Sequence, residues 1–447
     1  MQDFLSVLRR LLDRPRLVLA FVAAAVAVLL VCPVPVLDEE SYLDIAEQLS
    51  LSRPYDWWRP WPPWGAGRET DAFVYAHPPL FLWWVHLWAR MGAVVPATKV
   101  AAGLPWALLL GWGVGRLAER TTRRPWLSAA VWIACPISLL GLQRGLMPDL
   151  MLAALQTIAV VSWVEAGRDG AARRQGWLVG GGIALGLAIL TKYPAAALVP
   201  VLLVHGRLSG GGLRRSLPFW VALAIPLLLV EGWLWFAYGR PHVWEVLSRA
   251  GEIPRGPLRG RALGTAVRLA LGVTMVPLLF ASLRSAWLPA VAISGALVLW
   301  GAPDGTSAAQ MTALVALGAV GMASVWIATR GALAAGRRED LAPHDGLLLG
   351  GWAVAVVLAV VVGHNFSAPR YLLPAMAPLA LLVTRAVERL QGGRALLYTG
   401  AAVQGALALF ISTAEHHFFL AGDSVARQVA ASAQVPGRFT GEWSFRW

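Results

Sequence analysis

Long runs of apolar residues follow one another along almost the whole chain, and this pattern limits the possible folds more than any other feature. A helix of about 20 apolar residues crosses the hydrocarbon core of a bilayer. The candidate helices are 17–37, 79–95, 99–118, 125–142, 147–165, 177–191, 193–206, 217–237, 263–282, 286–302, 308–329, 346–363, 371–387 and 395–414. We therefore predict an all-α polytopic membrane protein, with a transmembrane domain over residues 1–414 and a short tail over residues 415–447.

The composition agrees with this class and excludes others. The chain has 447 residues, of which 57% are hydrophobic and 14% charged, whereas soluble domains carry about 25% charged residues. The net charge of +13 does not indicate nucleic acid, because basic loops of membrane proteins collect in the cytoplasm and face anionic lipids. Cys32 and Cys135 lie within apolar runs, so we expect small core residues and no disulfide or metal site. The first run ends without a cleavage site and is predicted to be an anchor.

Charge placement predicts which side of the membrane each loop occupies. If all fourteen candidates crossed, four strongly basic loops would lie outside, against the usual cytoplasmic excess of Lys and Arg. Segment 79–95 is rich in Trp and carries His86 and Arg90, which is typical of an interfacial helix. Without it, thirteen spans remain, and residues 38–98 form an outer first loop with interfacial helices. The basic loops around Arg120, Arg173, Arg214 and Arg337 then become cytoplasmic.

The predicted outer face collects two acidic positions and several cations. The acidic positions are the cluster Asp38-Glu39-Glu40 and Asp149, and the cations are His77, Arg144, Lys192 and Arg370. Charges at a membrane boundary are costly, so they are candidates for function. A carboxylate acts as a base or binds a divalent cation, and Lys and Arg suit a phosphate group. These residue types together indicate a site for a phosphorylated amphiphile and a polar acceptor.

Short motifs at these positions resemble a known family. They are Asp38-Glu39-Glu40-Ser41-Tyr42, Tyr75-Ala76-His77-Pro78-Pro79-Leu80, Arg144 to Met151, Leu190-Thr191-Lys192 and Pro369-Arg370-Tyr371-Leu372-Leu373-Pro374. In their order and spacing, from residue 38 to about 380, the chain resembles the GT-C glycosyltransferases. The most similar branch contains the protein O-mannosyltransferases and the lipid A aminoarabinose transferase.

The resemblance implies an inverting transfer of a sugar from a polyprenyl-phosphate carrier to a lipid, glycan or protein acceptor. It also implies the bacterial cytoplasmic (inner) membrane, with the active site on the periplasmic or extracellular side. A lipid or glycolipid transporter or flippase is the alternative. A transporter is expected to show internal repeats and charges near the midplane, whereas this chain has no clear repeat and its charges gather at one boundary. A third reading is an inactive scaffold, against which the intact Asp38 and Asp149 argue weakly.

The resemblance assigns roles to the acidic residues, and each has a structural alternative. Asp38 matches the catalytic base of the first loop, although it is also suited to cap a helix over 40–50. Glu39 is a catalytic or metal-binding neighbour. Asp149 matches the second acidic loop, although a carboxylate at a helix start is also stabilised by the helix dipole. Because some relatives use a divalent cation, Asp38 and Asp149 are candidate ligands for Mg²⁺ or Mn²⁺.

The cations are candidates for holding the lipid phosphate. His77 stands where the aminoarabinose transferase has a phosphate-binding lysine, and a histidine is only partly charged at neutral pH. Lys192 either binds phosphate or snorkels to the interface, and Arg370 with Tyr371 is the next candidate. Arg144 either binds phosphate or pairs with Asp149. Two further expectations concern residues outside this group. Glu231 is predicted to pair with an arginine of loop 238–262, and the glycines 180–182 are predicted to allow close helix packing.

Overall fold

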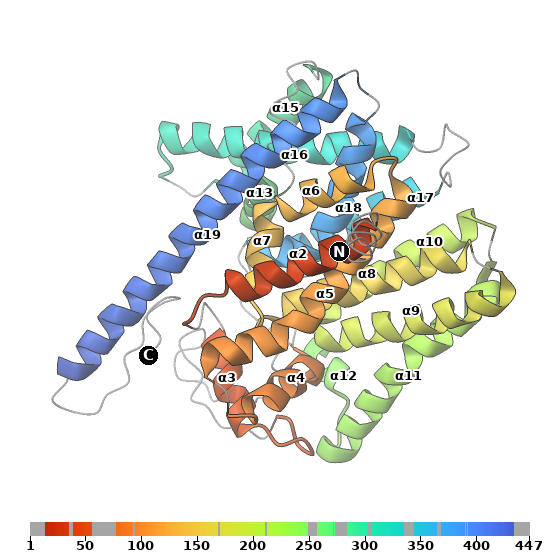
Figure 1. The fold of residues 1–447 in the computed structure, drawn as a ribbon, viewed down its shortest axis with the longest axis vertical. Helices are drawn as coiled ribbons and strands as arrows, with labels where there is room; N and C mark the ends of the chain where they lie inside the picture. The colour runs from red at the N-terminus through yellow and green to blue at the C-terminus, as the bar shows by residue number, and fades with distance from the viewer. Residues whose placement is uncertain are drawn as a thin grey trace, which may run out of the picture.

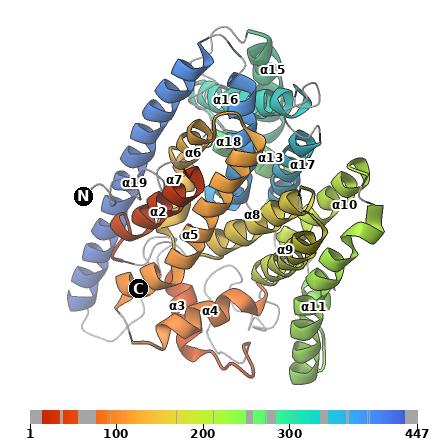
Figure 2. The ribbon, with the colours of Figure 1, turned by 45° about the vertical axis from the view of Figure 1, so that its right-hand side comes forward.

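The computed structural model is a bundle of helices, and the described part of the chain contains no strand (Figure 1). The described residues are 14–34, 39–55, 77–92, 94–168, 170–210, 212–248, 257–270, 272, 284–302, 305–334, 344–363, 368–388, 390 and 392–432. Figures 1 and 2 both place α3 and α4 at one end of the view, α13, α15 and α16 at the other, and α19 along one side. This confirms the predicted all-α class.

The helices of the N-terminal half are α2 (Pro15–Leu29), α3 (Glu39–Gln48), α4 (Pro79–Ala89), α5 (Val95–Thr121), α6 (Pro125–Ile133), α7 (Pro136–Gln143), α8 (Pro148–Ala166), α9 (Ala171–Thr191), the 3₁₀ helix η2 (Tyr193–Ala197), α10 (Leu198–Leu208) and α11 (Gly212–Tyr238). They are followed by α12 (His242–Ser248), α13 (Leu258–Leu269), α15 (Arg284–Gly301), α16 (Ala308–Ala334), α17 (Asp345–Leu358), the π turn η4 (Ala359–Gly363), the 3₁₀ helix η5 (Pro369–Leu372), α18 (Leu373–Val387) and α19 (Gly393–Ser432).

Proline sets several of the helix boundaries. Five helices, α2, α4, α6, α7 and α8, begin at a proline, where the missing N–H would have no helical partner in any case. The candidate span 125–142 is in fact the pair α6 and α7, bent by 68° at the break before Pro136. An internal proline removes a hydrogen bond and clashes with the preceding turn, so one continuous helix was the wrong prediction there.

Two other boundaries differ from the prediction. The first apolar helix, expected over 17–37, ends at Leu29, ahead of Pro33, because a residue that precedes proline is disfavoured in the helical region. The last helix, expected over 395–414, continues to Ser432 as a single α19. The tail predicted from residue 415 therefore begins within a helix, since the loss of apolar character after residue 414 does not end helical hydrogen bonding.

Among the described helices, seven are long and apolar enough to cross a membrane, or eight if the bent pair α6 and α7 forms one span. The number thirteen stays a prediction. Helix α4 has 11 residues, which rise about 16 Å and cannot cross a hydrocarbon core of about 30 Å. The structure thus supports the removal of 79–95 from the spans. Helix α4 instead contacts α3, α5 and α9, and Trp84 Nε1 donates to Ala102 O at 2.9 Å.

Helix α8 is the centre of the bundle. All of its residues except Ile158 are buried, and it contacts α5, α9 and α18. The close contact of α9 with its neighbours depends on glycine, as predicted for 180–182. A Cβ at Gly181 would meet Ser162 at 2.8 Å, and one at Gly182 would meet Phe219 O at 2.2 Å, although Gly180 faces open space.

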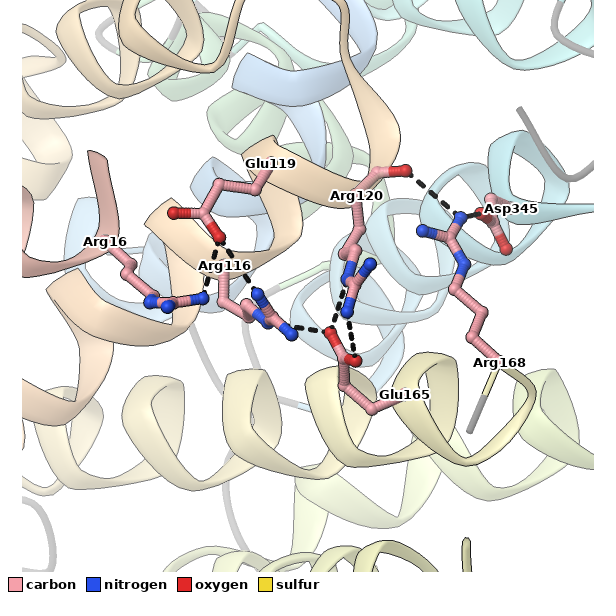
Figure 3. A network of polar contacts seen from close by, with 7 residues as sticks. All are labelled: Arg16, Arg116, Glu119, Arg120, Glu165, Arg168 and Asp345. Atoms are coloured by element: carbon pink, nitrogen blue, oxygen red, sulfur yellow. Dashed lines mark hydrogen bonds and ion pairs between the residues drawn. The ribbon is translucent and has the colours of Figure 1, made fainter. Parts of the chain in front are cut away.

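The two ends of α8 carry different chemistry. Glu165, near its C-terminal end, accepts bonds from Arg120 Nε and Nη2, both at 2.8 Å, and lies 2.8 Å from Arg116 Nε (Figure 3). Arg168 in turn binds Asp345 of α17 at 2.7 Å. This is the end that charge placement assigned to the cytoplasm. The N-terminal end of α8 carries Asp149, about 24 Å away along the helix axis by the standard rise per residue.

Candidate active site

Asp149 gathers two of the predicted cations into one buried group. Lys192 Nζ donates to Asp149 Oδ1 at 2.8 Å, and Arg370 Nε lies 3.6 Å from Asp149 Oδ2. The exposed fractions of these three residues are between 2% and 7%, so their charges interact with little screening by water. Two cations on one carboxylate leave this group with an excess positive charge, which suits an anionic ligand.

Local backbone geometry brings these three residues together. Asp149 lies in the first turn of α8, directly after Pro148. Helix α9 ends at Thr191, and Lys192 is extended, with φ −162° and ψ 121°, before Pro194 begins the turn into α10. Helices α9 and α10 are thus separate, in agreement with the separate candidate helices 177–191 and 193–206. Arg370 lies in the short 3₁₀ helix η5 ahead of α18. Each side chain comes from a helix end, where a charge can reach the boundary of an apolar bundle.

The Tyr371 ring lies against both cations of this group. Lys192 Nζ lies 4.2 Å from the ring centroid of Tyr371 and the Arg370 guanidinium lies 5.0 Å from it, within the range of cation–π attraction. Arg370 Nη2 also donates to the Tyr371 hydroxyl at 3.3 Å. A pocket beside them is lined by Asp149, Lys192, Tyr371 and apolar residues of α17, η4 and α18. The predicted residues Asp149, Lys192, Arg370 and Tyr371 thus form one site.

His77 lies close to this group and supplies no charge to it. Burial of the ring, followed by the nearby charges of Lys192 and Arg370, holds the pKa of His77 well below its usual value of 6.5. The ring is therefore neutral at pH 7, unlike the lysine that the resemblance places here. Tyr42, from the first-loop motif, has its ring centroid 6.2 Å from that of His77. The first loop and the segment before α4 thus meet beside the cations.

A second polar cluster lies next to Lys192. The Tyr193 hydroxyl donates to Glu231 Oε1 at 3.1 Å and lies 2.6 Å from His242 Nδ1. The His242 ring stacks on Tyr55 with centroids 4.8 Å apart, and the Tyr55 hydroxyl donates to His77 O at 3.1 Å. Glu231 also accepts from the Val243 backbone N–H.

This cluster adds residues that the sequence did not single out. Glu231 was expected to pair with an arginine of loop 238–262. Its described partners are Tyr193 and a backbone amide, and Arg249 and Arg255 of that loop lie outside the described residues. Tyr55 and His242 carried no motif. Their only signal was a position on the predicted outer side, so sequence reasoning missed them.

Glu39 is paired with a lysine that does not belong to the cation group. Glu39 Oε2 lies 2.6 Å from Lys99 Nζ, both side chains are fully buried, and Lys99 Nζ also donates to Val34 O at 3.1 Å. Glu39 therefore anchors the start of α3 to α5. Lys99 was missed because it opens an apolar run, although a lone cation at a predicted outer boundary was a usable signal. Asp38, the predicted base, lies outside the described residues, directly ahead of α3.

Arg144 is also bound elsewhere. It forms an ion pair with Glu415 of α19, so the expected pairing with Asp149 is wrong. Its neighbour Gly145 packs so closely against α5 that a Cβ there would lie 2.0 Å from Lys99 O. This contact fixes the loop that leads into α8. Arg144 directly follows α7, which packs against α19. Its partner is 271 residues away in sequence, so no local sequence pattern predicts this ion pair.

The described residues do not favour a metal at Asp149. Both of its carboxylate oxygens face cations, which would repel a divalent ion. In the described ranges, no group of three or more His, Cys, Asp and Glu side chains is placed to hold a metal. Asp38, the other candidate ligand, lies outside the described residues, so a site for Mg²⁺ or Mn²⁺ shared by Asp38 and Asp149 stays a prediction.

Part of the chain matches a known family model. Residues 99–247 match the family model described as dolichyl-phosphate-mannose-protein mannosyltransferase. No curated protein matches the chain by sequence.

The structure is similar to that of ArnT from Cupriavidus metallidurans bound to undecaprenyl phosphate, with a TM-score of 0.52 and 18% identity over 93% of this chain and 72% of that one. It is also similar to the apo form of ArnT, with a TM-score of 0.51 and 19% identity over the same shares. The chain therefore has the GT-C fold of membrane glycosyltransferases, as its motifs predicted.

Proposed function

We propose that this chain is an inverting membrane glycosyltransferase that moves a sugar from a polyprenyl-phosphate carrier to an acceptor on the outer face of the membrane. The observation that carries the proposal is the buried group of Lys192 and Arg370 on Asp149, next to a pocket floored by Tyr371. The match to the mannosyltransferase family model and the fold shared with ArnT, which was solved with undecaprenyl phosphate, support the same reaction.

The cations are placed to assist the departure of the phosphate, which is the most demanding step of such a reaction. As the bond between the anomeric carbon and the phosphate oxygen breaks, its electron pair stays on that oxygen. Lys192 and Arg370 then stabilise the growing negative charge, and fixed charges in a site with little water do this effectively. Asp149 holds the two cations in place before the donor binds. When the donor binds, the two cations replace part of their interaction with Asp149 by contact with the phosphate. The site is therefore organised before the donor arrives.

The acceptor needs a base on the other side of the anomeric carbon. An acceptor hydroxyl or amine attacks that carbon opposite to the leaving phosphate, which inverts its configuration, and its proton passes to a carboxylate. We assign this role to Asp38 on its match to the first-loop motif. The Glu39–Lys99 pair anchors the residue that follows Asp38, and His77, being neutral, serves as a hydrogen-bonding group. The acceptor is a lipid, a glycan or a protein.

The test is transfer by the purified full-length chain in nanodiscs, with a panel of undecaprenyl-phosphate sugars labelled in the sugar and an extract of envelope acceptors. We expect label to move from the donor to a more polar product. Lys192→Gln and Arg370→Gln should each reduce transfer by roughly two orders of magnitude. A matched control is Arg394→Gln, because Arg394 also lies over a tyrosine ring, that of Tyr398, but is exposed on α19.

Two results would count against the proposal. Equal losses in Arg394→Gln and Arg370→Gln would mean that the cation group has no special role. Movement of intact labelled donor between the leaflets, with no transfer of sugar by the wild type, would favour the flippase alternative. Asp38→Asn should abolish transfer and leave the binding of undecaprenyl phosphate near the wild-type level, which separates the base from the phosphate site.

A further inference from the structure

A second pocket lies at the other end of the bundle from Asp149. It forms where the C-terminal end of α8 meets the starts of α9, α11 and α17 and the end of α10, and it encloses about 840 Å³ including its open mouth. Its lining includes Arg168, Arg174, Arg215, His205 and Trp163. None of these residues takes part in the proposed reaction, so the pocket needs an explanation of its own.

The pocket has more positive charge than its own carboxylate can balance. Arg168 is paired with Asp345 at 2.7 Å (Figure 3), and Asp345 is the one acidic residue among the described lining residues. Arg174 and Arg215 have no carboxylate partner in the part of the chain that the structure describes. Arginines of a cytoplasmic loop are ordinarily solvated on a convex surface. Here three of them line a hollow, where an anion could contact more than one.

His205 adds a hydrogen-bond donor without an acceptor. Trp163 Nε1 donates to His205 Nδ1 at 3.0 Å. An indole N–H can only donate, so Nδ1 carries no proton and the proton of the neutral ring is on Nε2. His205 Nε2 is buried and has no hydrogen-bond partner among the described residues. Buried donors are rarely left unsatisfied, so this ring is suited to a site that an oxygen-rich ligand completes.

The surroundings indicate that the ligand comes from the bilayer. Exposed apolar side chains on α10 and α11 flank the pocket, including Val204, Leu208 and Leu213, each at least 50% exposed. The most apolar window of α11 is only 17% buried, so this helix presents most of its surface to lipid. A lipid whose head group enters the pocket could therefore lay its acyl chains along α10 and α11.

We propose that this pocket binds the phosphate of an anionic phospholipid, with Arg174 and Arg215 as the principal contacts. Phosphate suits paired guanidinium groups, which present several donors in a fixed plane. The leaflet that faces the cytoplasm is also rich in anionic lipids. The bound lipid contacts a pocket formed by five helix ends and holds them together. This site is independent of the proposed transferase reaction.

The test uses the full-length chain in nanodiscs of phosphatidylcholine with increasing fractions of phosphatidylglycerol, and it measures the midpoint of thermal unfolding. We expect the midpoint of the wild type to rise and saturate. In Arg174→Gln/Arg215→Gln, the half-saturating fraction should increase by about tenfold or more, as expected for the loss of two charged hydrogen bonds. The matched control is Arg173→Gln/Arg214→Gln, which removes the same charge from exposed neighbours that do not line the pocket.

If the control variant weakened the effect of anionic lipid as much as Arg174→Gln/Arg215→Gln, the effect would be a general attraction between basic loops and anionic lipid. That result would overturn the proposed site. No rise in the wild type would overturn it as well. Inorganic phosphate, added to nanodiscs of phosphatidylcholine alone, separates the two sources of the ligand. A rise as large as that with phosphatidylglycerol would overturn the assignment to a lipid. If Arg174→Gln/Arg215→Gln does not fold, the single variants serve, and each should weaken the lipid effect more than its neighbouring control.

Discussion

Glu39 Oε2 and Lys99 Nζ lie 2.6 Å apart, and neither side chain is exposed to solvent. The pair joins the first residue of α3 to the second turn of α5, and the same ammonium donates to Val34 O. One buried cation therefore holds the chain on both sides of residues 35–38. We infer from this arrangement that Glu39 positions the predicted base next to it, and the catalytic role that the resemblance allowed for Glu39 stays a prediction.

The first prediction concerns this pair. Lys99→Met should lower the free energy of unfolding by about 3–5 kcal/mol, because it leaves the Glu39 carboxylate buried without its counter-charge. Glu39→Gln/Lys99→Met should recover part of the loss. The measurement is thermal unfolding of the full chain in detergent. Glu47→Gln on the exposed side of α3 is the control. A Lys99→Met variant as stable as that control would contradict the role of the pair.

The second prediction concerns Asp149. Asp149→Asn leaves Lys192 and Arg370 buried near each other with no carboxylate between them, so stability should fall by about 3 kcal/mol in the absence of lipid phosphate. Undecaprenyl phosphate supplies the missing negative charge and should stabilise this variant more than the wild type. The readout is the shift in unfolding midpoint with added undecaprenyl phosphate. Equal shifts in the two proteins would show that Asp149 and the phosphate do not share the same cations.

The third prediction follows from the lowered pKa of His77. Below pH 6.5, the unfolded chain takes up a proton at this residue and the folded chain does not, so unfolding becomes easier as the pH falls. The loss amounts to about 1.4 kcal/mol per pH unit until the folded pKa is reached. Between pH 7 and pH 5, the wild type should therefore lose more stability than His77→Gln.

The control for His77 is His417→Gln, which changes an exposed histidine of α19. Its pH dependence should match that of the wild type. If His77→Gln lost as much stability between pH 7 and pH 5 as the wild type does, the ring would not be held neutral in the folded protein.

The fourth prediction tests the sides of the membrane. Cys32 and Cys135 are both buried, so single cysteines added at exposed positions can be labelled over a low background. In intact cells, Ser52→Cys after α3 should react with an impermeant maleimide. Arg173→Cys, at the start of α9, should react only after the membrane is opened. Reaction of both from the outside would place the arginine end of α8 outside and would contradict the predicted sides of the membrane.

Much of the site was predictable because its residues lie at the ends of apolar runs. Asp149, Lys192 and Arg370 each follow or precede a span, and short motifs marked them. The structure brings all three together with Tyr371. The partner of Arg144 was not predictable. It is Glu415, and the two residues are 271 positions apart, so their contact depends on how α19 packs against α7.

The sequence by itself determined the class of protein and the position of most helices, because the free energy of placing a segment in a bilayer depends on its own composition and length. Only the tertiary structure decided which charges meet. Lys99 binds Glu39, and Glu231 binds Tyr193. Near the C-terminal end of α8, two arginines share one carboxylate and three others line a pocket. Such pairs depend on the rotation and offset of neighbouring helices, which side-chain packing sets across the whole bundle.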